Sequence, residues 1–248
     1  MVQTYDQVTR RPKTTTVTRA TQVKPELTKR TYTFDPAGNV TKIADLPSGG
    51  SADVQCFTYD YLGRTSDAWT PAAVDKDCTV PTSTTELGGA APYWQTFSYD
   101  KTGNRKQEID RQPAGQVVSD YTYPPSGPNS AAPHAVQSVS VKGADNKTSV
   151  NTYGYFPDGS TQTRTVGGKT QTFEYDYEGH AVTETEKSGV SKYVYDAEGS
   201  RIITHDPTGA TLTVGDLQLT QAAGTDTVTA TRFYSHAGST VAQRVGGS

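Results

Sequence analysis

Residues 193–201 read Tyr193-Val194-Tyr195-Asp196-Ala197-Glu198-Gly199-Ser200-Arg201 and define the unit from which the chain is built. Side chains alternate between the two faces of a strand, so Tyr193 and Tyr195 should lie side by side on one face. Asp196 to Gly199 fits a type I turn, which favours Asp at its first position and Gly at its fourth. The Asp carboxylate can accept hydrogen bonds from turn amides, and Gly can adopt the positive φ that returns the chain. The stretch therefore predicts a strand, a tight turn and the start of a returning strand.

The same motif recurs along the chain: two aromatic residues one position apart, then Asp, then Gly three positions later. Five copies keep all four positions, namely Tyr32, Phe34, Asp35 and Gly38; Phe57, Tyr59, Asp60 and Gly63; Phe97, Tyr99, Asp100 and Gly103; Phe173, Tyr175, Asp176 and Gly179; and Tyr193, Tyr195, Asp196 and Gly199. Degraded copies lie at 121–127, 153–159, 205–209 and 233–238. Repetition of one hairpin implies that neighbouring copies stack and bury each other's faces.

Composition agrees with a sheet. Only 33% of the 248 residues are hydrophobic, whereas the chain has 15 Tyr, 23 Gly and 14 Pro. No apolar helical periodicity persists over three turns. The sequence predicts an all-β fold in which repeated β-hairpins form a long, curved or spiralling antiparallel sheet, because sheets twist rather than stay flat. We expect one repeat region over 1–248, with an irregular insertion at 71–92 and a long loop or seam at 124–133. Cross-strand aromatic pairs, worth roughly 0.2–1 kcal/mol each, should help to hold the sheet together.

Charge and hydropathy exclude two classes of partner. The net charge of −3 argues against a general nucleic-acid binder, since binding to the phosphate backbone needs a basic surface. The local excess of basic residues in 1–30 fits a solvated strand face better than an anion-binding arm. No apolar stretch approaches the ~20 residues that span a bilayer, and nothing at the N-terminus resembles a signal peptide. We therefore expect no membrane insertion by this segment.

Cys56 and Cys78 are the only cysteines. In an exported protein they could form a disulfide worth roughly 3 kcal/mol in the chain-entropy model. The alternative is two unrelated reduced thiols. The disulfide is favoured because both cysteines flank an irregular stretch that a covalent link would stabilise.

The motif offers little for catalysis or for binding a metal ion or cofactor. Each turn supplies one Asp, whereas calcium takes 6–8 oxygen ligands. The two cysteines and the four histidines (His134, His180, His205 and His236) show no zinc-ligand spacing. No Gly-x-Ser-x-Gly nucleophile elbow occurs, and Gly167-Gly168-Lys169-Thr170 lacks the rest of a phosphate-binding loop. We predict no catalytic residues, no metal site, no cofactor and no enzymatic activity.

Trp69 and Trp94 flank the 71–92 insertion and are the candidates for an alternative function. Exposed aromatic faces stack on sugars or on protein partners. On this hypothesis the chain is an extracellular carbohydrate- or receptor-binding module, similar to an adhesin. The competing interpretation, in which both indoles pack against the sheet or tether the insertion, is favoured.

The five copies closely resemble the YD repeats of Rhs proteins, a family that includes bacterial polymorphic toxins, the C component of Tc toxin complexes and the teneurins. The resemblance extends from about Tyr32 to the C-terminus. It implies a hollow shell of spiralling β-sheet that encloses a C-terminal toxin. On that basis the chain is expected to be a non-catalytic structural segment of a shell, secreted or at the cell surface. Its partners would be the rest of the parent shell and the enclosed toxin, and free sheet edges could also pair with other copies.

One departure from the family concerns self-cleavage. The family's shell usually ends in a motif of Pro, four residues, Asp-Pro, any residue and Gly-Leu. Asp206-Pro207-Thr208-Gly209 looks similar, but Arg201 stands at the Pro position and Ala210 at the Leu position. The cleavage site is therefore not carried over, and the chain is expected to be a segment from the middle of a longer shell.

Overall fold

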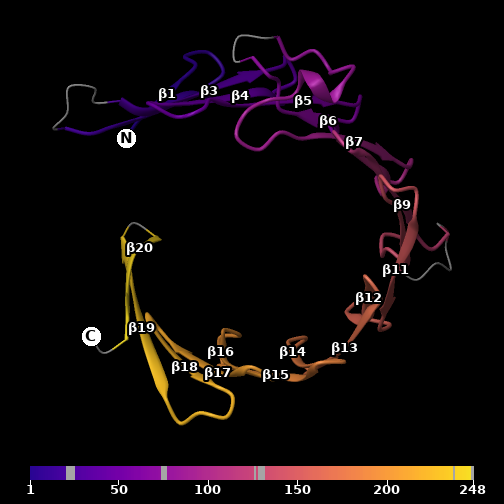
Figure 1. Cartoon of the computed structure of the whole chain (residues 1–248), viewed down its shortest axis with the longest axis vertical. Helices are drawn as coiled ribbons and strands as arrows, with labels where there is room; N and C mark the ends of the chain where they lie inside the picture. Colours follow the sequence, from indigo (N-terminus) through magenta and orange to yellow (C-terminus); the bar gives the residue numbers. More distant parts are fainter. Residues whose placement is uncertain (21–25, 74–76, 126, 128–131, 237, 247–248) are drawn as a thin grey trace. The chain divides into compact units, whose positions relative to one another are not determined.

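The computed structural model describes residues 1–20, 26–73, 77–125, 127, 132–236 and 238–246. Its 20 strands form one antiparallel sheet, and the described residues contain one short 3₁₀ helix, η1 (Thr84–Glu86). The predicted all-β fold of repeated hairpins in a long antiparallel sheet is confirmed (Figure 1). No helix in the described part of the chain is long and apolar enough to cross a membrane.

The chain divides into two compact units, Met1–Thr122 with Val139–Ser149 and Tyr123–Ser138 with Val150–Ser248. The boundary adjoins the predicted loop at 124–133, of which residues 126 and 128–131 lie outside the described residues. The strands of the first unit are β1 (Val2–Tyr5), β2 (Pro12–Thr18), β3 (Glu26–Phe34), β4 (Val40–Pro47), β5 (Asp53–Tyr59), β6 (Thr65–Trp69), β7 (Trp94–Tyr99), β8 (Arg105–Gln112), β9 (Gly115–Thr122) and most of β10 (Ser138–Lys142).

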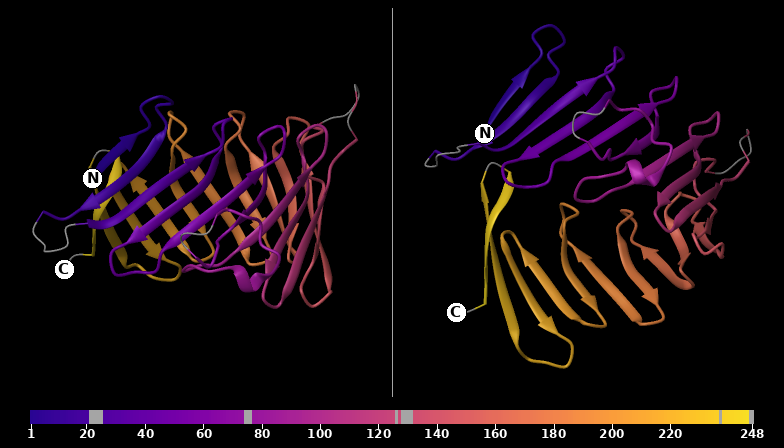
Figure 2. Two further views of the ribbon diagram at one scale, coloured as in Figure 1. Left: turned by 90° about the horizontal axis from the view of Figure 1, so that it is seen from above. Right: turned by 45° about the horizontal axis from the view of Figure 1, so that its top comes forward.

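The second unit repeats the same plan. Its strands are β11 (Thr148–Tyr155, from residue 150 onward), β12 (Thr161–Val166), β13 (Lys169–Tyr175), β14 (Ala181–Glu186), β15 (Gly189–Tyr195), β16 (Arg201–Asp206), β17 (Gly209–Val214), β18 (Leu217–Ala222), β19 (Val228–His236) and β20 (Ser239–Val245). Within each unit, strands adjacent in sequence pair with each other, and the hairpins are visibly twisted (Figure 2). The last predicted turn, 233–238, includes residue 237, which lies outside the described residues.

Each motif turn carries a bulge at the same place. In the opening stretch Val194 pairs with Ile203 but Tyr195 pairs with Arg201, so the returning strand contains one extra residue. The register shifts likewise at the second motif aromatic of the other four full copies. In each full copy the extra residue is the third after the motif glycine (Thr41, Ser66, Lys106, Val182 and Ile202), so this bulge is separate from the glycine turn. A β-bulge bends its strand and increases the local right-handed twist. Every full copy of the motif therefore carries the same bulge just beyond its turn.

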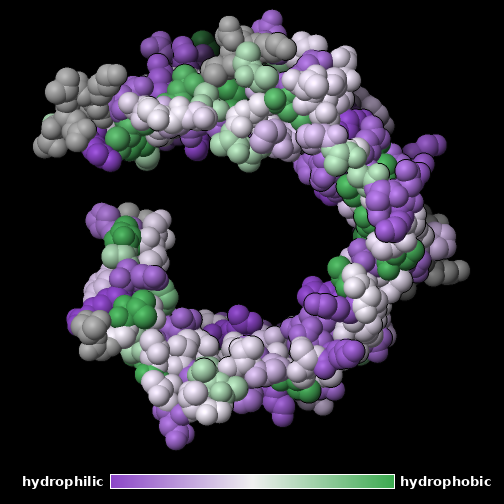
Figure 3. Space-filling model, viewed as in Figure 1, coloured by the Kyte–Doolittle hydropathy of each residue, from purple (hydrophilic) through white to green (hydrophobic). Residues whose placement is uncertain are grey.

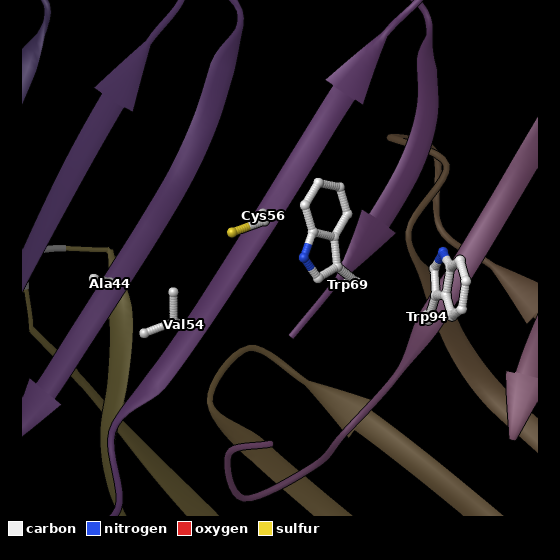
Figure 4. Packing of buried hydrophobic residues seen from close by; sticks show 5 residues of the cluster. All are labelled: Ala44, Val54, Cys56, Trp69 and Trp94. Atoms are coloured by element: carbon white, nitrogen blue, oxygen red, sulfur yellow. The ribbon is translucent and has the colours of Figure 1, made fainter. Parts of the chain in front are cut away.

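The apolar core is small, and most of it lies in one cluster. Ala44, Val54, Cys56, Trp69 and Trp94 form a buried cluster on β4 to β7 in the first unit (Figure 4). Among the described residues of the second unit, no side chain is fully buried. Figure 3 accordingly shows a surface in which apolar residues form small groups among polar ones. Outside the cluster, local contacts between neighbouring hairpins have to replace a thick core.

Candidate functional site

The motif aspartates accept hydrogen bonds from the amides of their own turns. Oδ1 of Asp100 accepts from the amides of Thr102 and Asn104, both at 2.9 Å. Oδ1 of Asp196 accepts from the amides two and four positions later, at 3.1 and 2.7 Å. The backbone closes the same turn, because the Gly199 amide donates to the Asp196 carbonyl at 3.1 Å. These carboxylates act as turn caps in the way that the residue pattern indicates.

The motif glycines all have the positive φ that the turn requires. Their φ angles are +103°, +75°, +93°, +84° and +80° for Gly38, Gly63, Gly103, Gly179 and Gly199. Two of them also lie close to the side chain of a preceding turn. A Cβ on Gly38 would stand 2.5 Å from an Nη of Arg11, and one on Gly199 would stand 3.0 Å from Nε2 of His180. At these two copies glycine gives both the backbone conformation and room for a neighbouring side chain.

The second motif aromatic joins its own copy to the preceding hairpin. The hydroxyls of Tyr59, Tyr99, Tyr175 and Tyr195 donate to the carbonyls of Val40, Thr65, Thr161 and Ala181, at 2.6 to 3.0 Å. Each acceptor lies two residues after the glycine of the preceding turn. Burial raises the pKa of Tyr59, and the Asp35 charge raises it further, so the phenol stays protonated as a donor. The repeated tyrosine therefore makes a repeated link between hairpins.

Removing one of these hydroxyls should weaken one link. We expect Tyr99→Phe to lower the free energy of unfolding by about 0.5–1.5 kcal/mol, the usual net value of one hydrogen bond. Urea titration followed by circular dichroism measures the change. Tyr61→Phe is the matched control, since Tyr61 lies at a turn tip and is 90% exposed. Equal stability of the two variants would contradict the link.

The sequence did not predict a role for the residue that follows each motif glycine. In four copies its side chain hydrogen-bonds Oδ2 of the turn aspartate, the residues being Asn39, Arg64, Asn104 and His180. Two of them also reach the next full copy or hairpin: the Arg64 guanidinium lies 4.5 Å from the Tyr99 ring centroid, and His180 stacks on Tyr195 at 4.6 Å. The sequence does contain one indication of this role: in all five full copies the residue after the glycine has a side chain that can form hydrogen bonds.

A further turn of the same kind precedes the first recognised copy. The Asp6 amide donates to the Arg11 carbonyl at 2.9 Å, and Asp6 Oδ1 accepts two turn amides. Arg11 then lies over the Phe34 ring at 5.5 Å and donates to the Asp35 carbonyl at 3.3 Å. The sequence pattern did not reveal this copy, because Arg10, with φ +60°, occupies the position of the motif glycine and the turn is one residue longer.

Aromatic rings in the structure contact cations more often than each other. Eight arginine–ring contacts occur among the described residues, including Arg105 over Phe97 at 4.9 Å and Arg201 over Tyr193 at 5.1 Å. Ring–ring contacts in the same part of the chain number two, Phe156 with Tyr175 and His180 with Tyr195. The expected ladder of aromatic pairs is therefore largely a ladder of ring–arginine pairs, each worth about 0.5–1 kcal/mol at exposed sites.

The turn aspartates make the fold sensitive to acid. Hydrogen bonds lower the pKa of Asp35, mainly from the Asn39 side chain, of Asp100, mainly from the Thr102 hydroxyl, and of Asp176, mainly from the His180 amide. A carboxyl whose folded-state pKa lies below its unfolded value of about 3.9 stabilises the fold above that pH. This stabilisation is lost as the pH falls through the folded-state pKa.

We therefore expect the Tm to change little between pH 7 and 5 and to fall below about pH 4. Thermal unfolding followed by circular dichroism across this range measures the effect. Asp100→Asn keeps an acceptor in the turn but removes one titrating group, so its Tm should fall less steeply in acid. A Tm that is constant down to pH 2 would contradict the prediction.

Trp69 and Trp94 lie inside the molecule. Trp69 is fully buried and Trp94 is 7% exposed, and Trp69 pairs across the strands with Cys56 on one side and Trp94 on the other. Stacking on a sugar or a partner needs exposed indole faces, which neither residue has. The structure instead gives both the packing role that the sequence analysis favoured (Figure 4).

Cys56 and Cys78 form a disulfide, with their Cα atoms 5.4 Å apart. The disulfide links β5 to the insertion at 71–92, of which residues 74–76 lie outside the described residues. Cys78 and Leu87 from the insertion pack against the buried cluster. The covalent link therefore lies within the main apolar contact of the first unit.

Asp176, Glu178 and His180 form the one group in the described residues with ligand atoms close enough to hold a metal ion. His180 Nδ1 lies 3.2 Å from Asp176 Oδ2 and 3.7 Å from a carboxylate oxygen of Glu178. Asn39 occupies the equivalent position in another turn and makes the same contact to its aspartate. The capping hydrogen bond thus accounts for this arrangement, and we assign no metal to it.

Fold and turn geometry together define an all-β hairpin-repeat protein. No protein-family model matches the sequence, and no curated protein matches it. Among solved structures, a Photorhabdus luminescens Tc holotoxin pore is similar at 13% identity and a TM-score of 0.43, over 98% of this chain and 14% of that one. A porin-like protein from Bacteroides uniformis is similar at 11% identity and a TM-score of 0.39, over 94% of this chain and 93% of that one. At these values neither structure assigns a family.

Proposed function

We propose that the chain is a non-catalytic structural segment of a shell of the Rhs, or YD-repeat, kind. In the parent protein this shell would enclose a C-terminal toxin or effector. The observation that carries the proposal is the tyrosine link, in which the motif of one copy hydrogen-bonds the backbone of the preceding hairpin. Because the repeated residues join one hairpin to the next, the motif has a structural role.

The polar atoms of the motif already make hydrogen bonds within their turn or to the preceding hairpin. The Asp100 carboxylate accepts two backbone amides and the Asn104 side chain, and the Tyr99 hydroxyl donates to a backbone carbonyl. A general base or nucleophile needs a polar atom that is free to contact substrate. The most frequently repeated polar residues of the chain are therefore better suited to holding hairpins than to chemistry.

The single-layer sheet also favours a role as part of a shell. The second unit has no fully buried side chain among its described residues, so neither of its sheet faces is covered by a second layer within that unit. A single-layer sheet suits a surface with solvent on one side and enclosed contents on the other. The partners on this proposal are the rest of the shell and the enclosed domain, in a secreted or cell-surface protein.

Protease protection in the parent protein tests the proposal. The enclosed domain that this proposal requires would be expressed both within the parent protein and alone, and both samples would be treated with the same protease. We expect digestion to be much slower within the parent protein. Equal rates of digestion in the two samples would refute an enclosing role.

A further inference from the structure

Part of the insertion lies beside Trp69. A pocket of about 370 Å³ is bounded by Trp69 and by Pro71, Asp77, Thr79, Pro81 and Glu86 of the insertion. Trp69 is nevertheless fully buried, and Cys78 packs against the same cluster. Residues Asp77–Pro81, which we call the cover, supply three of the five insertion residues that share this pocket with Trp69.

The insertion is held to the strands in two different ways. Its far end is joined to the residue that follows β6 by a hydrogen bond from the Gly88 amide to the Thr70 carbonyl at 3.0 Å, and to the start of the insertion by one from the Ala72 amide to the Glu86 carbonyl at 2.8 Å. Pro71 and Leu87 also form a β-bridge there. Within the described residues, no backbone hydrogen bond joins the cover to the strands, since the Thr79 amide donates to Asp77 inside the cover. The disulfide is the covalent tie between the cover and β5.

A thiol reagent has a route to this tie. Cys56 is fully buried, but Cys78 is partly exposed and lines an open pocket of about 780 Å³ beside Phe57 and Tyr59. A thiolate that attacks the Cys78 sulfur forms a mixed disulfide and releases the Cys56 thiolate, which takes up a proton. A second thiol then releases Cys78. Two reductant thiols become one disulfide, and the protein gains two cysteine thiols.

We propose that the Cys56–Cys78 disulfide is a thiol-sensitive latch that keeps the cover over Trp69. Reduction releases the cover and exposes Trp69, while the far end of the insertion stays in place. Trp94 stays covered, because the Arg111 guanidinium lies 4.1 Å from its ring and the cluster also includes Leu87. The latch would distinguish an oxidising exterior from a reducing cytosol. This inference does not depend on the proposed shell function.

The chain suits a direct test, because Trp69 and Trp94 are its only tryptophans. Trp94→Phe leaves fluorescence from Trp69 alone, and Trp69→Phe leaves it from Trp94 alone. Each variant would be treated with dithiothreitol under native conditions, and mass spectrometry after alkylation would measure the reduction. Acrylamide quenching then measures the accessibility of each indole. We expect quenching of Trp69 to rise several-fold with a red shift of its emission, and quenching of Trp94 to change little.

Three results would overturn the proposal. The first is unchanged quenching of Trp69 after complete reduction. The second is an equal rise in quenching for both indoles together with loss of the β-sheet circular dichroism signal. The third is resistance of the native disulfide to the reductant. Hydrogen exchange on the wild-type chain gives a readout without any tryptophan substitution. Reduction should speed exchange at Thr79, whose amide donates to the Asp77 carbonyl within the cover, and leave the amides of Thr70 and Gly88 protected. The double variant Cys56→Ser with Cys78→Ser should match the reduced wild type without reductant.

Discussion

Replacing Gly209 by alanine is expected to disrupt the pairing of β17 with β18. Gly209 has a φ of +151°, and an added Cβ would stand 2.0 Å from the Gln221 carbonyl oxygen and 3.0 Å from the Ala222 Cα. These are backbone atoms of the neighbouring strand, so the clash can be relieved only if the strand moves. Backbone strain of about 1–3 kcal/mol and overpacking of about 1–3 kcal/mol together predict a loss of roughly 2–6 kcal/mol in the free energy of unfolding.

Gly179→Ala is the matched control for this variant. Gly179 also has a positive φ, +84°, but nothing lies within 4 Å of its added Cβ. We expect only the backbone strain, about 1–2 kcal/mol. Urea titration measures both variants, and hydrogen exchange should show the effect of Gly209→Ala concentrated in residues 206–222. If the two alanine variants lose equal stability, the close approach to β18 has no energetic importance.

Trp69→Ala should produce a loss of similar or greater size. The indole is fully buried at the centre of the main apolar cluster, between Cys56 and Trp94. Removal of a buried aromatic side chain leaves a cavity and usually costs about 3–5 kcal/mol. Urea unfolding followed by circular dichroism measures this loss.

An exposed aromatic residue gives the comparison. Tyr177 lies at a turn tip and is fully exposed, so Tyr177→Ala should change the free energy of unfolding by no more than about 0.5 kcal/mol. A small loss for Trp69→Ala, similar to that for Tyr177→Ala, would mean that the cluster does not anchor the first unit.

The sequence predicted those features that depend on neighbouring residues. The Asp196 cap and the positive φ of Gly199 follow from four consecutive positions, and both occur as expected. Their recurrence was enough to predict the sheet. The Asp6 turn was not predicted because it is one residue longer than the motif turn and has Arg10, with a positive φ, in place of glycine.

Contacts between copies could not be predicted in the same way. The Tyr99 hydroxyl bonds a carbonyl 34 positions earlier, at Thr65, and no local pattern marks a backbone acceptor. The contact of Arg64 with the Tyr99 ring likewise depends on how two hairpins lie against each other. Periodicity indicates that aromatic residues share a face, but it does not show that arginines lie over their rings.

The tyrosine link uses a backbone acceptor, so it does not depend on the side chain of the hairpin that it contacts. The acceptor residues are of three types (Val40, Thr65, Thr161 and Ala181), yet each presents the same backbone carbonyl. A duplicated or deleted hairpin would therefore find a suitable acceptor without any compensating substitution at the new junction. Gene segments encoding whole hairpins can be gained or lost with little penalty, so related chains should vary in length by complete copies of the motif.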